Sequence, residues 1–205
     1  MVYEAHGALR PKNLAGISDD QIAQHWQLYE GYVAQTNGLR DELETLRRKG
    51  RGDTPAYADR HRRFGFEYNG MVLHEYYFGN LKAQVAEPSG TSALKKALTG
   101  QFGSFEAFKE DFMHTGATRS VGWAILYLDP ATGALSNHFI QLHEQGNVAG
   151  FIPILVMDVW EHAYMVDYGA GGRSQYITAF FSNVNWAVVE KRCAEALTGK
   201  IPTRF

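Results

Sequence analysis

The sequence predicts an α+β fold, in which a helical first half precedes a part that holds three strands and further helices. Three observations predict this class. Apolar residues follow the helical period through most of residues 17–85, the period shortens to that of strands between residues 122 and 157, and turn-forming residues separate the segments. The 205 residues are enough for one large domain, or for two small ones that share a core.

Two long helices are expected in the first half. Ser18 or Asp19 offers an N-cap for the first helix, in which apolar residues recur at intervals of three and four from Ile22 to Leu46. A cluster of turn-forming residues at 50–55 ends this pattern, and a second apolar helix is expected over 69–85. Two long helices joined by such a break indicate an antiparallel helical hairpin.

The elements that follow change in type after a Pro- and Gly-containing junction at 87–92. Short apolar and aromatic runs predict strands, and the segments on either side of them have helical patterns. We expect helices at 93–98, 104–114, 176–181 and 186–197, and strands at 122–128, 135–142 and 152–157. The junction indicates two domains, which we expect at residues 1–88 and 89–205.

The composition and the sequence limit the cellular compartments and the classes of partner that are expected. A net charge of −2 gives no bulk attraction to nucleic acid or to an anionic membrane. No stretch is long and apolar enough to span a membrane, and the N-terminus lacks the apolar core of a signal peptide. Cys193 is the only cysteine, which suits a reducing compartment. We therefore expect a cytoplasmic protein with neither nucleic acid nor membrane as a partner.

Three of the eight histidines lie in suggestive surroundings, although a single histidine is in most cases a surface or core residue without a chemical role. His25 and His74 lie beside aromatic residues on the two long helices, and their side chains can face each other if the helices pair. His162 follows Asp158 by four residues at the end of the third expected strand. Three imidazoles and a carboxylate would suit iron, manganese or zinc better than calcium or magnesium, and the absence of a cysteine disfavours structural zinc. Periodicity alone does not show that the four residues meet.

A signature in the same region narrows these possibilities. The segment Asp158-Val159-Trp160-Glu161-His162-Ala163-Tyr164 resembles the D-x-W-E-H-A-aromatic signature of the iron/manganese superoxide dismutase family. Further segments resemble the family over nearly the whole chain, namely Gly122-Trp123, Val184-Asn185-Trp186 and the stretch from Asn69 to Leu81. The resemblance implies an N-terminal antiparallel helical hairpin and a C-terminal α/β domain with a three-stranded antiparallel sheet.

The resemblance also implies an activity and its residues. The protein would be a superoxide dismutase that converts superoxide into O2 and H2O2 at one iron or manganese ion per chain. Glu161 and His162 would join a second subunit in a homodimer or tetramer. The implied ligands are His25, His74, Asp158 and His162, and the implied surroundings are Tyr32 beside the substrate, Trp123 and Trp160 as an apolar wall, and Arg173 as a guide for anions.

Some positions depart from the family pattern. His25 and Tyr32 are seven residues apart, one fewer than is usual in the family. A histidine commonly follows the first ligand by one turn, and the nearest residue here is Tyr29. The tyrosine that meets this histidine across the subunit interface is replaced by Met165, so both members of that contact are altered.

The preferred metal depends on the residue that contacts the bound solvent. Many iron enzymes carry glutamine at the position of Gly70, whereas manganese enzymes supply a glutamine from the strand region, where His143 or, in another alignment, Glu144 stands here. This combination resembles iron-using and metal-tolerant members, so we expect iron, with manganese as the alternative. An inactive dismutase-fold scaffold is a second interpretation, which the presence of all four ligand residues disfavours. A di-iron carboxylate oxidase is excluded because the sequence contains no Glu-x-x-His motif.

Overall fold

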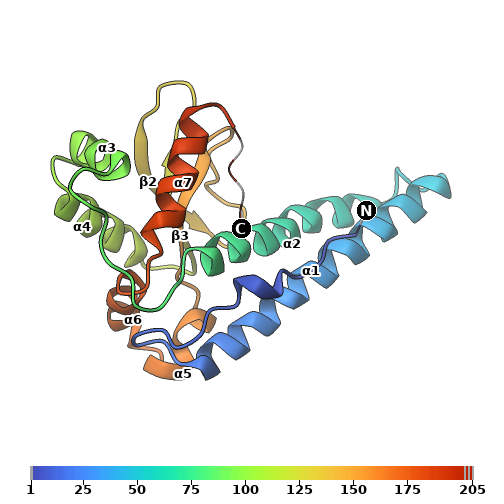
Figure 1. Cartoon of the computed structure of the whole chain (residues 1–205). Coiled ribbons are helices and arrows are strands. Elements are labelled where there is room, and N and C mark those ends of the chain that lie inside the picture. The colour runs from blue at the N-terminus through green and yellow to red at the C-terminus, as the bar shows by residue number, and fades with distance from the viewer. Residues whose placement is uncertain (1, 201, 203, 205) are drawn as a thin grey trace.

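The computed structural model describes residues 2–200, 202 and 204, and it confirms the α+β class. Helices α1 (Asp19–Arg48) and α2 (Pro55–Gly79) form an antiparallel hairpin whose turn points away from the rest of the molecule (Figure 1). The base of this hairpin lies against the remaining helices and a small sheet. The beginning of α1 and the end of α2 are therefore the parts of the hairpin that meet the rest of the chain.

The helix ends follow ordinary capping chemistry. Ser18 caps α1 by accepting a hydrogen bond of 3.0 Å from the backbone N–H of Gln21. Thr54 caps α2, and Pro55 occupies its first turn, where a missing N–H costs nothing. The predicted start of the second helix at residue 69 was wrong by fourteen residues, because charged residues at 59–63 interrupt the apolar pattern in the part of α2 that lies far from the core.

The other predicted helices are present. They are α3 (Ala93–Phe102), α4 (Phe105–Gly116), α6 (Arg173–Phe181) and α7 (Trp186–Leu197). Three short elements were not predicted, because three or four residues are too few to show a period: η1 (Gly7–Leu9), η2 (Glu161–Ala163) and α5 (Met165–Tyr168). Of the helices that the structure describes, none combines the length and apolar content needed to cross a lipid bilayer.

The sheet contains three antiparallel strands, β1 (Gly122–Leu128), β2 (Leu135–Gln141) and β3 (Ile152–Asp158), in the order β2-β1-β3. Central β1 is buried along its whole length, which explains its continuous run of apolar residues. In the register between β1 and β3, Trp123 pairs with Asp158. Residues opposite each other in this way have side chains in contact range, so the register brings an indole beside the carboxylate at the end of β3.

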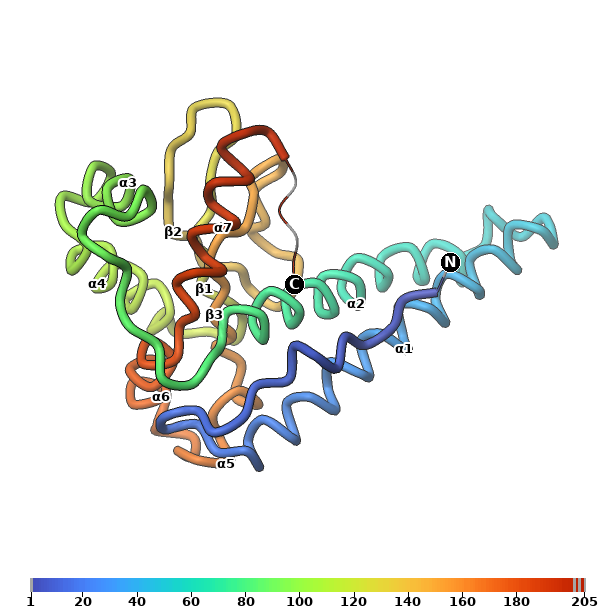
Figure 2. Tube along the Cα trace, viewed as in Figure 1, coloured from blue at the N-terminus to red at the C-terminus, as the bar shows by residue number. Residues whose placement is uncertain are grey.

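Asn80 joins the end of the hairpin to the sheet and to α7. Its Nδ2 donates to the backbone oxygen of Val156 on β3 at 2.5 Å, and its Oδ1 accepts from Arg192 on α7 at 2.5 Å. Its backbone oxygen accepts from the N–H of Asn185 at 2.6 Å. Figure 2 shows the end of α2 beside the start of α7. This connection ends α2 before the predicted residue 85 and fixes His74, six residues earlier, with respect to β3.

Candidate metal centre

The structure brings His25, His74, Asp158 and His162 together at the base of the hairpin. One potential ligand atom from each residue lies within 4.8 Å of all the others. Asp158 Oδ2 is 3.0 Å from Nε2 of His25, 3.1 Å from Nε2 of His162 and 3.7 Å from Nε2 of His74. His25 comes from α1, His74 from α2, Asp158 from the end of β3 and His162 from η2. Residues separated by up to 137 positions in the sequence thus share one small volume.

The tautomer of His74 is fixed by its surroundings. Its Nδ1 is 2.6 Å from the backbone oxygen of Gly70, which can only accept a hydrogen bond, so the ring proton is on Nδ1. Nε2 therefore carries a lone pair, and it is buried without a hydrogen-bond partner in the described chain. This lone pair faces the carboxylate of Asp158, so two acceptors point at each other at 0% exposure. A cation bound between them would satisfy both.

The protonation states match the needs of a metal ligand. Burial lowers the pKa of His25 and lowers that of His74 well below its usual value, so both imidazoles are neutral near pH 7. Burial by itself would raise the pKa of Asp158, but the facing His162 and His25 hold it well below its usual value. Neutral imidazoles and an ionised carboxylate are the forms that bind metals.

The distances also fit a shared ion. Imidazole nitrogens and carboxylate oxygens bind first-row metals at about 2.0–2.2 Å, so ligand atoms around one ion lie roughly 3–4 Å apart. The separations from Asp158 Oδ2 to the three imidazole nitrogens are 3.0, 3.1 and 3.7 Å. Three nitrogens and one oxygen suit iron, manganese or zinc. The residues present therefore fit the metal that the resemblance implies.

Hydrogen bonds from Trp160, Tyr176 and Gln21 hold the backbone and side chains of the cluster, and the sequence did not indicate the last two of these residues. The N–H of Trp160 donates to Asp158 Oδ1 at 2.8 Å, and the hydroxyl of Tyr176 donates to the backbone oxygen of Asp158 at 2.7 Å. Gln21 donates from Nε2 to the backbone oxygen of His162 at 2.6 Å and accepts from the N–H of Val166 at 3.0 Å. Such contacts orient ligands. The sequence gives no signal for Gln21, because a single glutamine on a helix is usually a surface residue.

A directed chain of hydrogen bonds lies beside the cluster. The indole N–H of Trp123 donates to Nδ1 of His143 at 3.0 Å, so the His143 proton must be on Nε2. His143 Nε2 is 2.7 Å from the hydroxyl of Tyr32 and donates to it. The Tyr32 proton therefore points away from His143. Burial lowers the pKa of His143 to about 4, which keeps the ring neutral in this role.

Gly70 makes room for Tyr32. A Cβ atom at position 70 would lie 2.6 Å from Cδ1 of the Tyr32 ring, closer than side-chain carbons come in practice. The ring of Tyr32 is centred 5.1 Å from that of His74, so Tyr32 borders the cluster. Burial raises the pKa of Tyr32; the charges of Asp158 and Glu67 add to this rise, while that of Arg63 opposes it. The tyrosine thus stays protonated at all ordinary pH values.

Two indoles shield the cluster. The ring of Trp123 lies 5.1 Å from that of His74 in an edge-on arrangement, and its side chain is fully buried. The ring of Trp160 stacks on His143 at 4.9 Å and on His162 at 5.6 Å. Large apolar rings in these positions exclude water from the space around the four ligand atoms.

The remaining residues singled out in the sequence differ in how they lie relative to the cluster. Arg173 begins α6 and donates from Nη1 to the backbone oxygen of Ser120 at 2.7 Å, and the structure gives it no hydrogen bond to the four cluster residues. Glu144 is exposed, whereas His143 is buried beside Tyr32, so His143 is the one of the two that reaches the cluster. Tyr29 is fully buried and donates to Glu75, so it does not lie on the surface as a subunit contact would. Met165 is exposed.

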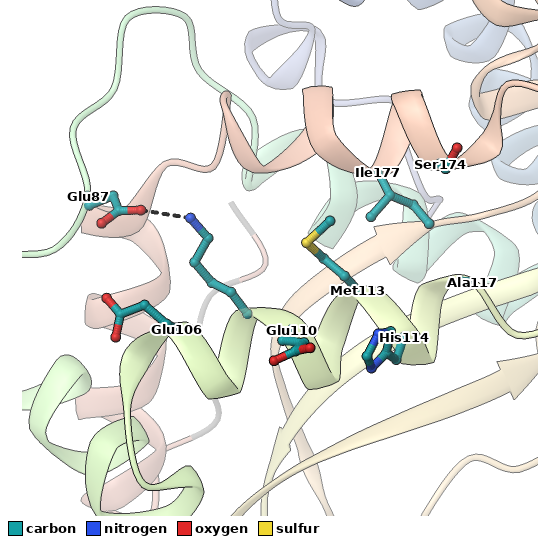
Figure 3. A pocket seen from close by; sticks show the side chains of 9 residues that line it. Glu87, Glu106, Glu110, Met113, His114, Ala117, Ser174 and Ile177 are labelled. Atoms are coloured by element: carbon teal, nitrogen blue, oxygen red, sulfur yellow. Dashed lines mark hydrogen bonds and ion pairs between the residues drawn. The ribbon is translucent and has the colours of Figure 1, made fainter.

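A mostly apolar hollow lies elsewhere on the molecule. It has a volume of 410 Å³ and lies between α4 and α6, lined by residues that include Glu106, Glu110, Met113 and Ile177 (Figure 3). Glu87 accepts a hydrogen bond from Lys109 at its rim, drawn as a dashed line in Figure 3. None of the four cluster residues lines it, so it is separate from the candidate metal centre.

Comparison with known proteins gives one consistent result. Residues 89–192 match the model of the family described as iron/manganese superoxide dismutases, C-terminal domain. The chain is 40% identical to the superoxide dismutase [Fe] of Aquifex aeolicus over 195 residues, 92% of this chain and 90% of that protein. It is 34% identical to the superoxide dismutase [Mn] 2 of Haloferax volcanii (95% and 94% covered) and 35% identical to the superoxide dismutase [Mn/Fe] of Aeropyrum pernix (87% and 83% covered). The chain therefore belongs to the iron/manganese superoxide dismutase family.

Proposed function

We propose that this chain disproportionates superoxide at one iron or manganese ion, with His25, His74, Asp158 and His162 as the ligands from the protein. One observation carries the proposal: the buried lone pair of His74 Nε2 and the ionised carboxylate of Asp158 face each other with two further imidazoles beside them. The names of the relatives support the choice of metals, since they include iron, manganese and both.

The reaction consumes two superoxide anions and two protons and yields O2 and H2O2. A bound iron or manganese ion supplies one-electron redox chemistry at this position. The chain supplies the surroundings. Asp158 balances part of the positive charge, Trp123 and Trp160 exclude water, and the Tyr32 hydroxyl, which accepts a hydrogen bond from His143, has its own proton free to point toward the substrate.

Arg173 has a supporting role in the proposal. Its Nε and Nη2 are buried without a hydrogen-bond partner in the described chain, so two donors of a fixed positive charge remain available to an anion. A positive group near a buried site raises the rate of encounter with a small anion, even on a protein whose net charge is −2. We therefore keep Arg173 as the guide for superoxide.

We favour iron over manganese. Position 70 is glycine, and the side chain that reaches Tyr32 from the end of the second strand is an imidazole. This is the combination that resembles iron-using and metal-tolerant members of the family. Elemental analysis of the protein purified from its own cells decides between the two metals.

The test combines metal content with superoxide removal. We expect about one iron or manganese ion per purified chain, and we expect His74→Ala to lose both the metal and the activity. His138→Ala is the matched control, because His138 is a half-exposed histidine on β2 whose bond is to Ser136. A chain that retains metal but never removes superoxide would favour the inactive scaffold instead. Full activity in His74→Ala would contradict the ligand assignment.

We further propose that two copies of the chain associate around Glu161 and His162, as a dimer or as a tetramer built from such dimers. Glu161 is exposed, and the His162 side chain is 21% exposed although it belongs to the cluster. Exposed apolar side chains lie on α1 and α5 near them, namely Leu28, Met165 and Val166. Leu28 lies two turns beyond Gln21, which contacts Val166 and His162, on the same side of α1.

Light scattering during size-exclusion chromatography tests this association. We expect a dimer or a tetramer for the native chain and a monomer for Met165→Glu, which buries a charge in the contact. Leu197→Glu is the control, since Leu197 is also an exposed apolar residue but lies on α7. A monomeric native chain would reject the proposal.

Two further proposals concern the location of the protein in the cell and its division into domains. We propose a cytoplasmic address, which fractionation of the source cells tests. We also propose a domain boundary at residues 88 and 89, supported by the irregular stretch between α2 and α3. Limited proteolysis is expected to cut there before it cuts elsewhere, and a first cut within α1 or the sheet would contradict this boundary.

A further inference from the structure

Glu67 is a buried carboxylate on α2 outside the metal cluster. Its side chain is only 5% exposed, and Arg63, one turn earlier, contacts its Oε1 through Nη2 at 2.5 Å and through Nε at 2.6 Å. Arg63 itself is 55% exposed. The negative charge of Glu67 is thus balanced by one guanidinium that lies at the surface.

Phe66 links this ion pair to the residues beside the cluster. The guanidinium carbon of Arg63 lies 4.3 Å from the centre of the Phe66 ring. The same ring is 4.5 Å from the His143 ring and 6.3 Å from the Tyr32 ring. One aromatic ring therefore separates the ion pair from the hydrogen bond between His143 and Tyr32, a separation at which charges still act on one another.

We propose that Arg63 is a positioning residue for the anionic substrate: it balances the charge of Glu67 and holds Phe66 against His143, so that an anion approaching Tyr32 does not meet an unbalanced negative charge from Glu67. The inference rests on the proposed function, which makes superoxide the substrate. Without Arg63, Glu67 would remain as a poorly solvated negative charge close to the path of the anion and would repel it.

Three variants of the metal-loaded protein separate charge from packing. Arg63→Ala removes the compensating charge, Arg63→Ala with Glu67→Gln removes both charges, and Glu67→Gln alone leaves the positive one. Arg62→Ala is the matched control, because Arg62 is the neighbouring residue, its side chain is 76% exposed, and it pairs with exposed Asp59 at 3.9 Å.

Two readouts are measured, kcat/KM for superoxide and the Kd of azide, a small monovalent anion whose binding needs no turnover. At low ionic strength we expect Arg63→Ala to lower kcat/KM and to raise the Kd of azide, each by about two- to fivefold. The loss should shrink as salt is added. The double variant should recover most of the lost kcat/KM and azide affinity. Glu67→Gln should equal or exceed the wild type in both quantities, and Arg62→Ala should match the wild type.

The inference fails if Arg63→Ala behaves as Arg62→Ala does, or if the double variant recovers neither readout. Weaker azide binding in Glu67→Gln would also overturn it, and that variant keeps Arg63 and an almost isosteric side chain should Arg63→Ala fold poorly. The wild-type protein is assayed first. If it neither holds metal nor removes superoxide, the proposed function fails; if it does both, the variants test Arg63 alone.

Discussion

At the scale of single residues, the position of each residue around the axis of α1 decides which side chains reach the cluster. His25 and Tyr32 both face inward on this helix, and so does Tyr29, which is fully buried. Tyr29 is the residue nearest to the position at which the family commonly carries an interface histidine, yet Leu28 is the exposed one. A one-residue difference in spacing rotates every later side chain by about 100°. The aromatic surroundings and the family resemblance therefore indicated the cluster histidines, whereas the spacing along α1 did not show which neighbour points outward.

The first prediction concerns Gly70, whose missing Cβ leaves room for Tyr32. A Cβ atom there would lie 2.6 Å from Cδ1 of the ring. Forcing extra atoms into a packed interior typically costs ~1–3 kcal/mol. We predict that Gly70→Ala lowers the free energy of unfolding by about that amount and lowers superoxide removal, because Tyr32 must move away from His143. Urea denaturation and the activity assay measure the two effects.

Gly65 provides the control on the same helix. The nearest atom to a Cβ at position 65 is Oε2 of Glu144 at 3.4 Å, the end of an exposed and flexible side chain. Gly65→Ala should therefore raise the free energy of unfolding by about 0.5–1 kcal/mol, the usual gain from replacing glycine in a helix. Equal losses in both variants would contradict the explanation from Tyr32.

The second prediction concerns Cys193, which is 3% exposed. Burial raises the pKa of its thiol from 9.0 to about 11. Since the folded pKa lies above the unfolded value, this contribution to stability is complete below pH 9 and is lost as the pH rises toward 11. Cys193→Ala should lack this part of the alkaline decline in stability. In the folded wild type at neutral pH, a thiol reagent should react far more slowly than in guanidinium chloride.

At the scale of secondary-structure elements, the sequence predicted the existence and type of the long elements better than their ends. The three strands lie within one residue of the predicted ranges, because each is a short apolar run bounded by turn-forming residues. The start of α2 was missed, since the tip of the hairpin packs against no core and carries few apolar residues. The capping residues Thr54 and Pro55 are the signal that could have found it.

The third prediction tests the joint between elements at Asn80. This side chain satisfies Val156 of β3 and Arg192 of α7, and both partners are buried. Asn80→Ala leaves a buried carbonyl and a buried guanidinium without this partner, and each such loss costs about 1–3 kcal/mol. We predict a loss of roughly 2–5 kcal/mol in the free energy of unfolding, together with weaker metal retention, because His74 and Asp158 are no longer fixed to each other.

Asn137→Ala is the control for this variant. Asn137 is an asparagine on β2 whose Nδ2 bonds to the exposed Asp111 at 2.8 Å. Its replacement should change the free energy of unfolding by no more than about 1 kcal/mol and should leave the metal content unchanged. If Asn80→Ala unfolds at the same urea concentration as Asn137→Ala, the joint does not hold the two parts as argued.

At the scale of the whole molecule, the strand order β2-β1-β3 and the way the hairpin lies on the sheet could not be derived from periodicity. A period reports which face of one element is apolar, not which element covers it. The contacts between the helical hairpin and the rest of the chain depend on single polar residues, such as Asn80 and Gln21. These residues are not part of any hydrophobic pattern in the sequence. The family signature around Asp158 and His162 supplied what the periodicity lacked, because it carries a known arrangement with it.

The last prediction follows from the position of the cluster between the hairpin and the sheet. Its ligand atoms come from α1, α2, β3 and η2, so an ion bound there ties together elements that separate on unfolding. A ligand that binds only the folded state stabilises it by about 2.7 kcal/mol when its free concentration is one hundred times Kd. We predict that chelation lowers the melting temperature of the wild type by several degrees or more, and that added iron or manganese restores it. In His74→Ala the chelator should have little effect, since one ligand is already missing. A melting temperature unchanged by chelation in a protein shown to have lost its metal would mean that the four residues do not join the two halves through an ion.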